Sequence, residues 1–209
     1  MDYIEKKKRG LIIVFEGLDK SGKSTHANML KTALEELHIK SELYSFPNRE
    51  TDIGSLIDKY LKNEIKMSDR AIHLLFSANR WEIIDEIKSK LNDGVSIIMD
   101  RYVYSGIAYS LAKGNLDYEW CMSCDKGLPK PDFIYFLNSD FCKENFDEEI
   151  YEEVEFQKRV CEEYSKLLCR EKDIFIIESK NSMMFNHKII LEHFLSSNKI
   201  LSKKSFKYF

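Results

Sequence analysis

Short apolar runs alternate along the chain with longer segments of mixed polarity. The runs lie near residues 10–16, 41–46, 95–99, 132–137 and 173–177. The first of them, Leu11-Ile12-Ile13-Val14-Phe15, contains no polar residue. A continuous apolar run of this length is typical of a strand buried on both faces of a parallel sheet. The pattern therefore predicts a strand at each of these places.

Helical spacing of apolar residues marks the segments between the runs. After the first run, apolar residues recur at Ala27, Leu30, Ala33, Leu34 and Leu37, on one face of a helix. The same spacing predicts helices near 23–37, 52–62, 68–92, 150–170 and 184–196, with shorter helical pieces between 103 and 126.

The alternation of strands and helices predicts the fold class. Right-handed crossovers between strands imply an α/β fold of three layers, with a five-stranded parallel sheet and helices on both faces. A chain of 209 residues suits one such domain, which we expect to span residues 1–209. Ligands of these folds bind at the carboxyl ends of the strands, so the residues that follow the strands are candidates for the site.

One polar, acidic segment interrupts this pattern. It runs from Asp140 to Glu149 and contains Phe141 and Phe146. We expect it to form a small mobile lid, at about 139–150, and not a boundary between domains.

Composition and charge narrow the classes of function. Apolar residues make up 44% of the chain and charged residues 32%, as in globular proteins. The net charge of −3 argues against nucleic acid as the main partner. An anion bound by this chain must therefore be held by local geometry.

The sequence carries no predicted targeting or membrane segment. Met1 to Arg9 is charged, and the apolar run that follows is too short to cross a membrane. Lys6-Lys7-Lys8-Arg9 is favoured as a solvated tail over a nuclear-localisation patch. Five scattered cysteines indicate a reducing compartment, and the lone pair Cys121 and Cys124 makes a zinc site improbable. We expect a cytoplasmic protein, with a nuclear location left open.

Gly17-Leu18-Asp19-Lys20-Ser21-Gly22-Lys23-Ser24 fits the phosphate-binding loop, G-x-x-x-x-G-K-[ST]. The loop follows the first predicted strand and opens the first predicted helix, which is the context that such a loop requires. The predicted three-layer α/β fold is therefore of the P-loop NTPase type. Gly17 and Gly22 let backbone N–H groups approach phosphate oxygens. Lys23 is then expected to reach the β- and γ-phosphates, and the Ser24 hydroxyl to ligate Mg²⁺.

An acid and an arginine follow the third predicted strand. Asp100 lies where a Walker B carboxylate would hold Mg²⁺ through water or orient Arg101; a helix N-cap or turn is the alternative. Arg101, at the end of a strand in a cleft, needs an anionic partner.

A second arginine, Arg49, follows the second predicted strand within Phe46-Pro47-Asn48-Arg49. It can clamp a second phosphate-bearing molecule, although a loop arginine by itself is more often a surface charge. The phosphate-binding loop at the same edge favours the clamp.

Phe76 and Arg80 lie four residues apart in the long predicted helix, so they share one face. A flat ring beside a planar fork of donors suits a nucleobase. Spacing alone favours a different interpretation, with Phe76 in the core and Arg80 as a surface charge.

Taken together, these segments resemble the thymidylate kinase family, which phosphorylates dTMP to dTDP with ATP. The resemblance runs in the family's order through Phe15 to Thr25, Phe46 to Arg49, Leu74 to Glu82, Asp100 to Gly106, Gly127 to Asp132 and Glu148 to Glu152. It implies that Phe76 stacks on thymine, that Arg80 bonds its carbonyl edge, and that Tyr109 disfavours a ribose 2′-hydroxyl. It also implies a homodimer.

The resemblance further implies the full set of site residues. ATP with Mg²⁺ would be held by Gly17, Lys20, Ser21, Gly22, Lys23, Ser24 and Thr25, with Ser24 and Asp100 toward the metal. The dTMP site would comprise Asp19, Phe46, Arg49, Phe76, Arg80, Arg101, Ser105, Gly106, Tyr109, Glu149, Tyr151 and Gln157. The catalytic residues would be Lys23, Lys20, Arg101 and Asp19.

Two features differ from many relatives, which carry arginines in the loop or the lid. The loop has Lys20, and residues 138–158 contain no arginine. We expect Lys20, or the weaker candidate Lys143, to supply the positive charge near the transferring phosphoryl group.

Two other functions stay open from the sequence. One is a kinase of the same fold with a broader range of deoxynucleoside monophosphates. The other is a noncatalytic nucleotide-binding regulator. The guanine-reading pattern N-K-x-D of GTPases is absent, since Asn198-Lys199 is followed by Ile200 and Leu201.

Overall fold

Five parallel strands form the central sheet of the computed structural model, which describes residues 8–138, 154–201 and 205–209. The strands are β1 (Ile12–Gly17), β2 (Ser41–Ser45), β3 (Ser96–Asp100), β4 (Phe133–Asn138) and β5 (Ile174–Glu178). They are paired in the order β2-β3-β1-β4-β5, and every pair is parallel. The predicted fold class is confirmed, with each strand within a residue or two of its predicted place.

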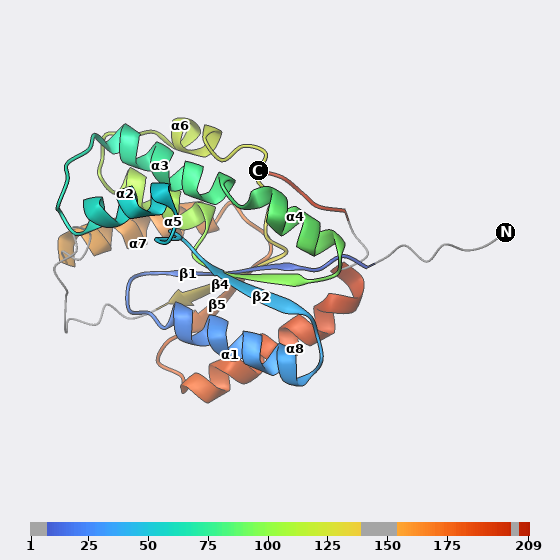
Figure 1. Ribbon diagram of the computed structural model, residues 1–209. Helices are drawn as coiled ribbons and strands as arrows, with labels where there is room; N and C mark the ends of the chain where they lie inside the picture. The colour runs from blue at the N-terminus through green and yellow to red at the C-terminus, as the bar shows by residue number, and fades with distance from the viewer. Residues whose placement is uncertain (1–7, 139–153, 202–204) are drawn as a thin grey trace.

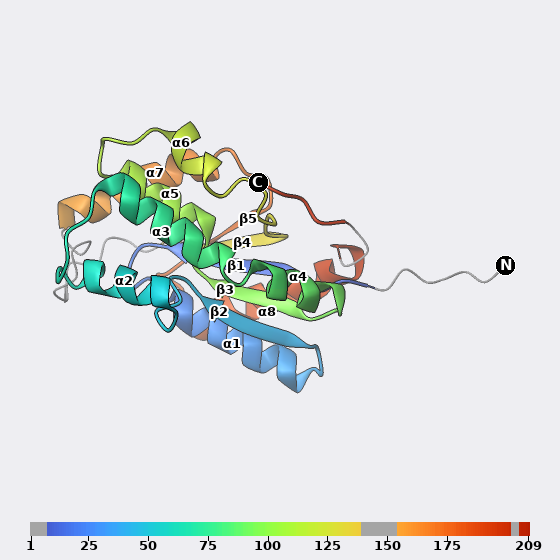
Figure 2. The ribbon, with the colours of Figure 1, turned by 45° about the horizontal axis from the view of Figure 1, so that its top comes forward.

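Helices cover both faces of the sheet (Figure 1). One face carries α1 (Lys23–Glu36) and α8 (Met183–Leu201). The other carries α2 (Asp52–Leu61), α3 (Asp69–Trp81), α4 (Ile84–Asn92), α5 (Val103–Leu111), α6 (Tyr118–Ser123) and α7 (Val154–Leu168). Figure 2 shows the same two layers from a second direction.

β1 is buried along its whole length, because both of its faces are covered. Ile12 and Val14 pack into the core beneath α2 to α7. Ile13 and Phe15 pack into the core beneath α1 and α8. The unbroken apolar run at the start of the chain follows from this position in the centre of the sheet.

The helix predicted near 68–92 is wrong in one respect, because the structure has two helices there, α3 and α4. The two helices are separated at Glu82 and Ile83. There the Glu82 carboxylate accepts a hydrogen bond, at 2.9 Å, from the hydroxyl of Thr51, which lies in the segment before α2. Buried residues keep helical spacing across the break, at His73, Ser77, Arg80, Ile84, Ile87 and Leu91. Periodicity therefore could not reveal it.

The other predicted helices are present with shifted ends. Within the described residues α7 begins at Val154, and α8 continues to Leu201, beyond the predicted 196. The short pieces predicted between 103 and 126 are α5 and α6. The predicted lid at 139–150 lies outside the described residues, and the single domain over 1–209 stays a prediction.

The carboxyl ends of β1, β2 and β3 meet at one edge of the sheet. Asp100, the last residue of β3, is in register with Phe15 of β1 and with Ser45 of β2. The loops that follow these three strands therefore lie side by side.

In the described part of the chain, no helix has the combination of length and apolarity that crossing a membrane requires.

Candidate active site

A cavity of about 460 Å³ opens where these loops meet. Its walls include most of the predicted site residues: Asp19, Lys20, Lys23, Ser24, Phe46, Arg49, Phe76, Arg80, Asp100, Arg101, Ser105, Gly106 and Tyr109. Gly17 is the last residue of β1, Ser21 and Gly22 belong to the loop that follows it, and Thr25 belongs to the first turn of α1. The predicted residues Glu149 and Tyr151, and the candidate Lys143, lie outside the described residues.

The loop between β1 and α1 has the backbone conformation that glycine permits. Gly17 has a φ of 143° and Gly22 a φ of 90°, in the region that residues with a Cβ rarely adopt. Lys20 also has a positive φ, of 60°, although it is not a glycine. An uncommon conformation of this kind at a non-glycine residue is a feature of functional loops.

Lys23 is buried in this loop with its ammonium group turned inward. Nζ donates to the carbonyl of Leu18 and lies 3.4 Å from the Ser21 hydroxyl. Burial, followed by the nearby Arg101 guanidinium, lowers the pKa of Lys23 to about 7. A bound anion would restore the full charge on this side chain.

Arg101 lines the cavity and has a left-handed backbone conformation, with a φ of 66°. Nη1 donates to the carbonyl of Gly17 at 3.1 Å and to the Ser105 hydroxyl at 3.0 Å. Nη2 forms an ion pair with Asp19 and lies 3.5 Å from the Tyr109 hydroxyl. The guanidinium is therefore fixed before any ligand arrives.

Asp19 connects the phosphate-binding loop to the rest of the cavity. Besides pairing with Arg101, it accepts hydrogen bonds from the Tyr109 hydroxyl at 2.8 Å and from Gln157 Nε2 at 2.9 Å. Burial alone would raise its pKa, but the charges of Arg101 and Lys23, together with the hydrogen bonds from Tyr109 and Gln157, outweigh burial and the pKa of Asp19 is lowered. The carboxylate is thus ionised at neutral pH.

Glu16 is a buried carboxylate to which the sequence analysis assigned no role. Oε1 accepts from the backbone N–H groups of Tyr102 at 2.9 Å and Ser105 at 3.2 Å. Oε2 accepts from the hydroxyls of Ser105 at 2.5 Å and Tyr164 at 2.8 Å. These bonds fix the turn that carries Arg101 and the start of α5. The feature of the sequence that could have revealed this role is a charged residue at the end of an otherwise apolar strand.

Ser24 and Asp100 are adjacent, as the predicted metal role requires. The Ser24 hydroxyl donates to Oδ2 of Asp100 at the mouth of the phosphate-binding loop. Hydroxyl and carboxylate oxygens are the hard donors that Mg²⁺ takes alongside phosphate and water oxygens. This donor pair fits Mg²⁺ bound together with a polyphosphate.

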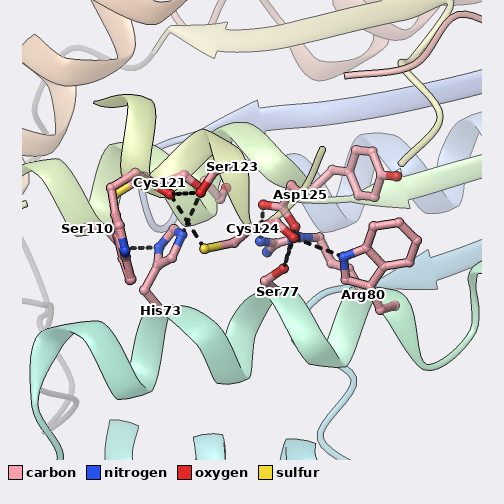
Figure 3. Close-up of polar contacts among 12 residues, drawn as sticks. His73, Ser77, Arg80, Ser110, Cys121, Ser123, Cys124 and Asp125 are labelled. Carbon is pink, nitrogen blue, oxygen red and sulfur yellow. Dashed lines mark hydrogen bonds and ion pairs between the residues drawn. The ribbon is translucent and has the colours of Figure 1, made fainter. Parts of the chain in front are cut away.

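Arg80 is a wall of the cavity and not a surface charge, which corrects the interpretation favoured by spacing alone. Only 2% of its side chain is exposed, and it forms an ion pair with Asp125, whose side chain is fully buried. Nε and Nη2 donate to the two carboxylate oxygens at 3.0 and 2.5 Å. Ser77 donates to the same carboxylate at 2.8 Å (Figure 3).

Gly106 gives the Arg80 guanidinium its space. A Cβ placed on Gly106 would lie 2.9 Å from Nη1 of Arg80 and 3.1 Å from Nη2. A residue without a side chain is therefore needed at position 106 for close packing against Arg80. Nη1 of Arg80 lies next to Gly106, which lines the cavity. Phe76, one turn earlier on α3, is partly buried and lines the same cavity.

His73 extends the buried polar cluster on α3 (Figure 3). Its Nδ1 lies 2.7 Å from the Ser110 hydroxyl and its Nε2 3.0 Å from the carbonyl of Cys121. Burial, partly offset by the hydrogen bond to Cys121, lowers the pKa of His73. A neutral imidazole therefore links α3 to α5 and α6.

Arg49 reaches the cavity from the loop after β2. Nη1 pairs with Asp58 on α2 at 2.6 Å, and 42% of the Arg49 side chain is exposed. The loop itself is held by Asn79, whose Oδ1 accepts from the Asn48 N–H at 2.7 Å. The Phe46–Pro47 peptide bond in this loop is cis.

Comparison with known proteins places the chain among well-described relatives. The family model for thymidylate kinase matches residues 15–190. The thymidylate kinase of Schizosaccharomyces pombe is 50% identical over 168 residues, which are 78% of this chain and 80% of that protein. The human thymidylate kinase is 44% identical over 165 residues, 77% of this chain and 78% of that protein. A solved structure of thymidylate kinase from Candida albicans, described as an enzyme of broad substrate specificity, has a TM-score of 0.86 and 38% identity, covering 97% of this chain and 99% of that one.

The buried pair of Arg80 and Asp125 should matter far more for stability than the exposed pair of Arg49 and Asp58. Asp125→Asn leaves a buried arginine without its counter-charge, so we expect the free energy of unfolding to fall by about 3–5 kcal/mol. The matched substitution Asp58→Asn should lower it by less than about 1 kcal/mol. Urea denaturation of both variants measures the difference, and similar losses would contradict this assignment of the buried charge.

Proposed function

Because the chain belongs to the thymidylate kinase family, we propose that it transfers the γ-phosphoryl group of ATP to dTMP inside the cavity at the edge of the sheet. It is a phosphotransferase that converts dTMP to dTDP. The observation that carries the proposed site is the placement of cations on two walls of one cavity. Lys23 and Arg101 lie at the phosphate-binding loop, where Arg101 contacts Gly17 and Asp19, and Arg49 lies on the loop that follows β2. Two polyanions can then meet between them.

The donor half of the proposed site is the loop from Gly17 to Ser24 with the start of α1. Its N–H groups and Lys23 hold the phosphates of ATP, with Ser21 and Thr25 at the helix start. Ser24 and Asp100 hold Mg²⁺. When bound, Mg²⁺ neutralises charge on the β- and γ-phosphate oxygens.

The acceptor half is the cavity between α3 and α5. Arg101 and Arg49 bind the phosphate of dTMP, and Phe76 stacks on the thymine ring. Because Nε and Nη2 of Arg80 are held by Asp125, Nη1 is left to donate to a thymine carbonyl. Among the remaining predicted residues, Asp19 meets the 3′-hydroxyl, Tyr109 excludes a 2′-hydroxyl, and Phe46, Ser105 and Gly106 complete the described wall.

Gln157 contributes to the acceptor half through Asp19, to which it donates a hydrogen bond. Its side chain is 3% exposed, so it is fixed by its surroundings on α7. Glu149 and Tyr151 stay proposed members of this half of the site.

The chemistry that this site performs is mostly alignment. The attacking atom is a phosphate oxygen of dTMP, which is already anionic at neutral pH, so no side chain has to remove a proton. The protein brings this oxygen in line with the γ-phosphorus and stabilises the charge that spreads over the transferring group. Lys20, held in a left-handed conformation at the edge of the cavity, is the proposed cation for that charge.

A broader range of acceptors is the second candidate function. Stacking on Phe76 accepts any base, and one donor from Arg80 can bond the O6 of guanine as well as the O4 of thymine. The similar enzyme from Candida albicans is described as broad in specificity.

We also propose that the protein is a homodimer located in the cytoplasm. Helices α2 and α3 carry exposed apolar side chains that suit an interface, namely Leu56, Leu74 and Trp81. A sedimentation measurement of the mass in solution tests the dimer.

The direct test of the function is formation of ADP from Mg-ATP with dTMP, dUMP, dGMP, UMP or no acceptor. We expect ADP with dTMP, a much slower reaction with dUMP, which lacks the thymine methyl group, and little ADP with UMP, whose ribose carries the 2′-hydroxyl that Tyr109 excludes. Comparable rates with dGMP would support the broader kinase. ADP formation that never depends on an acceptor would refute the proposed reaction.

Lys20→Ala separates catalysis from binding of the acceptor. Removing a charge that acts on the transferring phosphoryl group should lower kcat by about a hundredfold and leave KM for dTMP nearly unchanged. Lys31→Ala, on the outer face of α1, is the control and should behave as the wild type. A rise in KM for dTMP with an intact kcat would assign Lys20 to binding instead.

A further inference from the structure

Residues 205–209, here called the C-terminal segment, are docked on a loop that lies about eighty positions earlier in the chain (Figure 1). The N–H of Phe209 donates to the carbonyl of Leu128 at 3.0 Å, and the N–H of Gly127 donates to the carbonyl of Phe209 at 3.3 Å. The N–H of Lys130 donates to the carbonyl of Lys207 at 2.8 Å. Backbone bonds in both directions make a short antiparallel pairing, which fixes the register of the segment.

Aromatic contacts reinforce this docking. The Phe209 ring packs edge-on against Tyr104, with ring centroids 5.5 Å apart, and lies tilted against Tyr102, with centroids 6.1 Å apart. The ammonium group of Lys130 lies over the same ring, 5.2 Å from its centroid. Nearby, Arg9 lies 4.6 Å from the centroid of the Phe206 ring. Such contacts stabilise the docked segment beyond what burial of the rings contributes. The segment is therefore held by side chains as well as by backbone hydrogen bonds.

Tyr102 connects the C-terminal segment to the cavity. It follows Arg101 directly, lines the cavity and is 1% exposed. Its ring lies 5.8 Å from that of Phe46, another cavity residue, and its hydroxyl donates to the carbonyl of Pro129 at 3.3 Å. Phe209 therefore contacts the Tyr102 ring, and the loop at Pro129, with which the C-terminal segment is paired, accepts the hydrogen bond of its hydroxyl.

A second connection leads to the base end of the cavity. The N–H of Leu128 donates to the carbonyl of Asp125 at 3.1 Å, so the paired loop fixes the backbone of Asp125. Asp125 in turn holds the Arg80 guanidinium. Both connections end in the acceptor half of the cavity, at Tyr102, Phe46 and Arg80.

We propose that Phe209 is a positioning residue for the acceptor site. It sets the affinity for the nucleoside monophosphate through Tyr102 and through the loop that carries Asp125, without touching the ligand. This inference deepens the proposed function and rests on it, because it assigns the Phe46, Tyr102 and Arg80 walls to the acceptor.

The test compares Phe209→Ala with the wild type by steady-state kinetics and by calorimetric titration of dTMP. Loss of the ring contacts should raise both KM and Kd for dTMP about threefold to tenfold. KM for ATP and kcat at saturation should stay within about twofold of the wild type. Phe209→Tyr, which keeps the ring, should restore the affinity. Tyr208→Ala is the matched control, because Tyr208 lies in the same segment with 51% of its surface exposed.

Three results would overturn the proposal. One is an unchanged affinity for dTMP in Phe209→Ala. The second is a parallel rise in KM for ATP and dTMP, which would indicate a general loss of structure. The third is an equal effect from Tyr208→Ala. If the wild type binds dTMP but transfers no phosphoryl group, the proposed function fails, and the comparison of Kd values still decides the role of Phe209.

Discussion

Burial of positive charge at the carboxyl ends of β1 and β3 is the constraint on which the rest of the structure depends. Arg101 and Lys23 lie side by side against the central strand, where water cannot fully solvate them. A buried charge is tolerated only when it is paired and hydrogen-bonded. Asp19 supplies the pair for Arg101, and Glu16 holds the turn on which Arg101 stands. Arg101 makes these contacts from a left-handed backbone conformation.

The same arrangement occurs at the other end of the cavity, where Asp125 fixes Arg80. Each arginine is thus oriented before a ligand binds, which reduces the ordering that binding would otherwise require. Lys23 differs, because its ammonium group donates to the carbonyl of Leu18 and not to a carboxylate. Burial and the nearby Arg101 guanidinium lower its pKa, and a bound phosphate would restore its charge. A protein of net charge −3 can therefore attract two polyanions to one place.

The sequence was enough to predict the parts of the molecule that local rules determine. The phosphate-binding loop, Asp100, Arg101 and Arg49 all lie at or just after the ends of strands, and parallel strands bring their carboxyl ends together. Asp125 could not be identified in this way, because it lies 45 positions from Arg80 and nothing in its surroundings marks it among 35 acidic residues. The break between α3 and α4 was missed because helical spacing of buried positions continues across it, and the contact made there, between Glu82 and Thr51, joins distant parts of the chain. Docking of Phe209 likewise depends on a pairing between distant segments.

The most direct test of the account is proton uptake when Mg-ATP binds. At about pH 8, Lys23 with a pKa near 7 is mostly neutral in the free protein, and a bound polyphosphate should raise that pKa and draw up to about one proton from the buffer. Calorimetric titrations in two buffers of different ionisation enthalpy should therefore give different binding enthalpies. The difference should disappear in Lys23→Arg, whose charge is permanent. Equal enthalpies in the two buffers for the wild type would show that Lys23 is already charged, and would contradict the claim that the buried cation depends on its ligand.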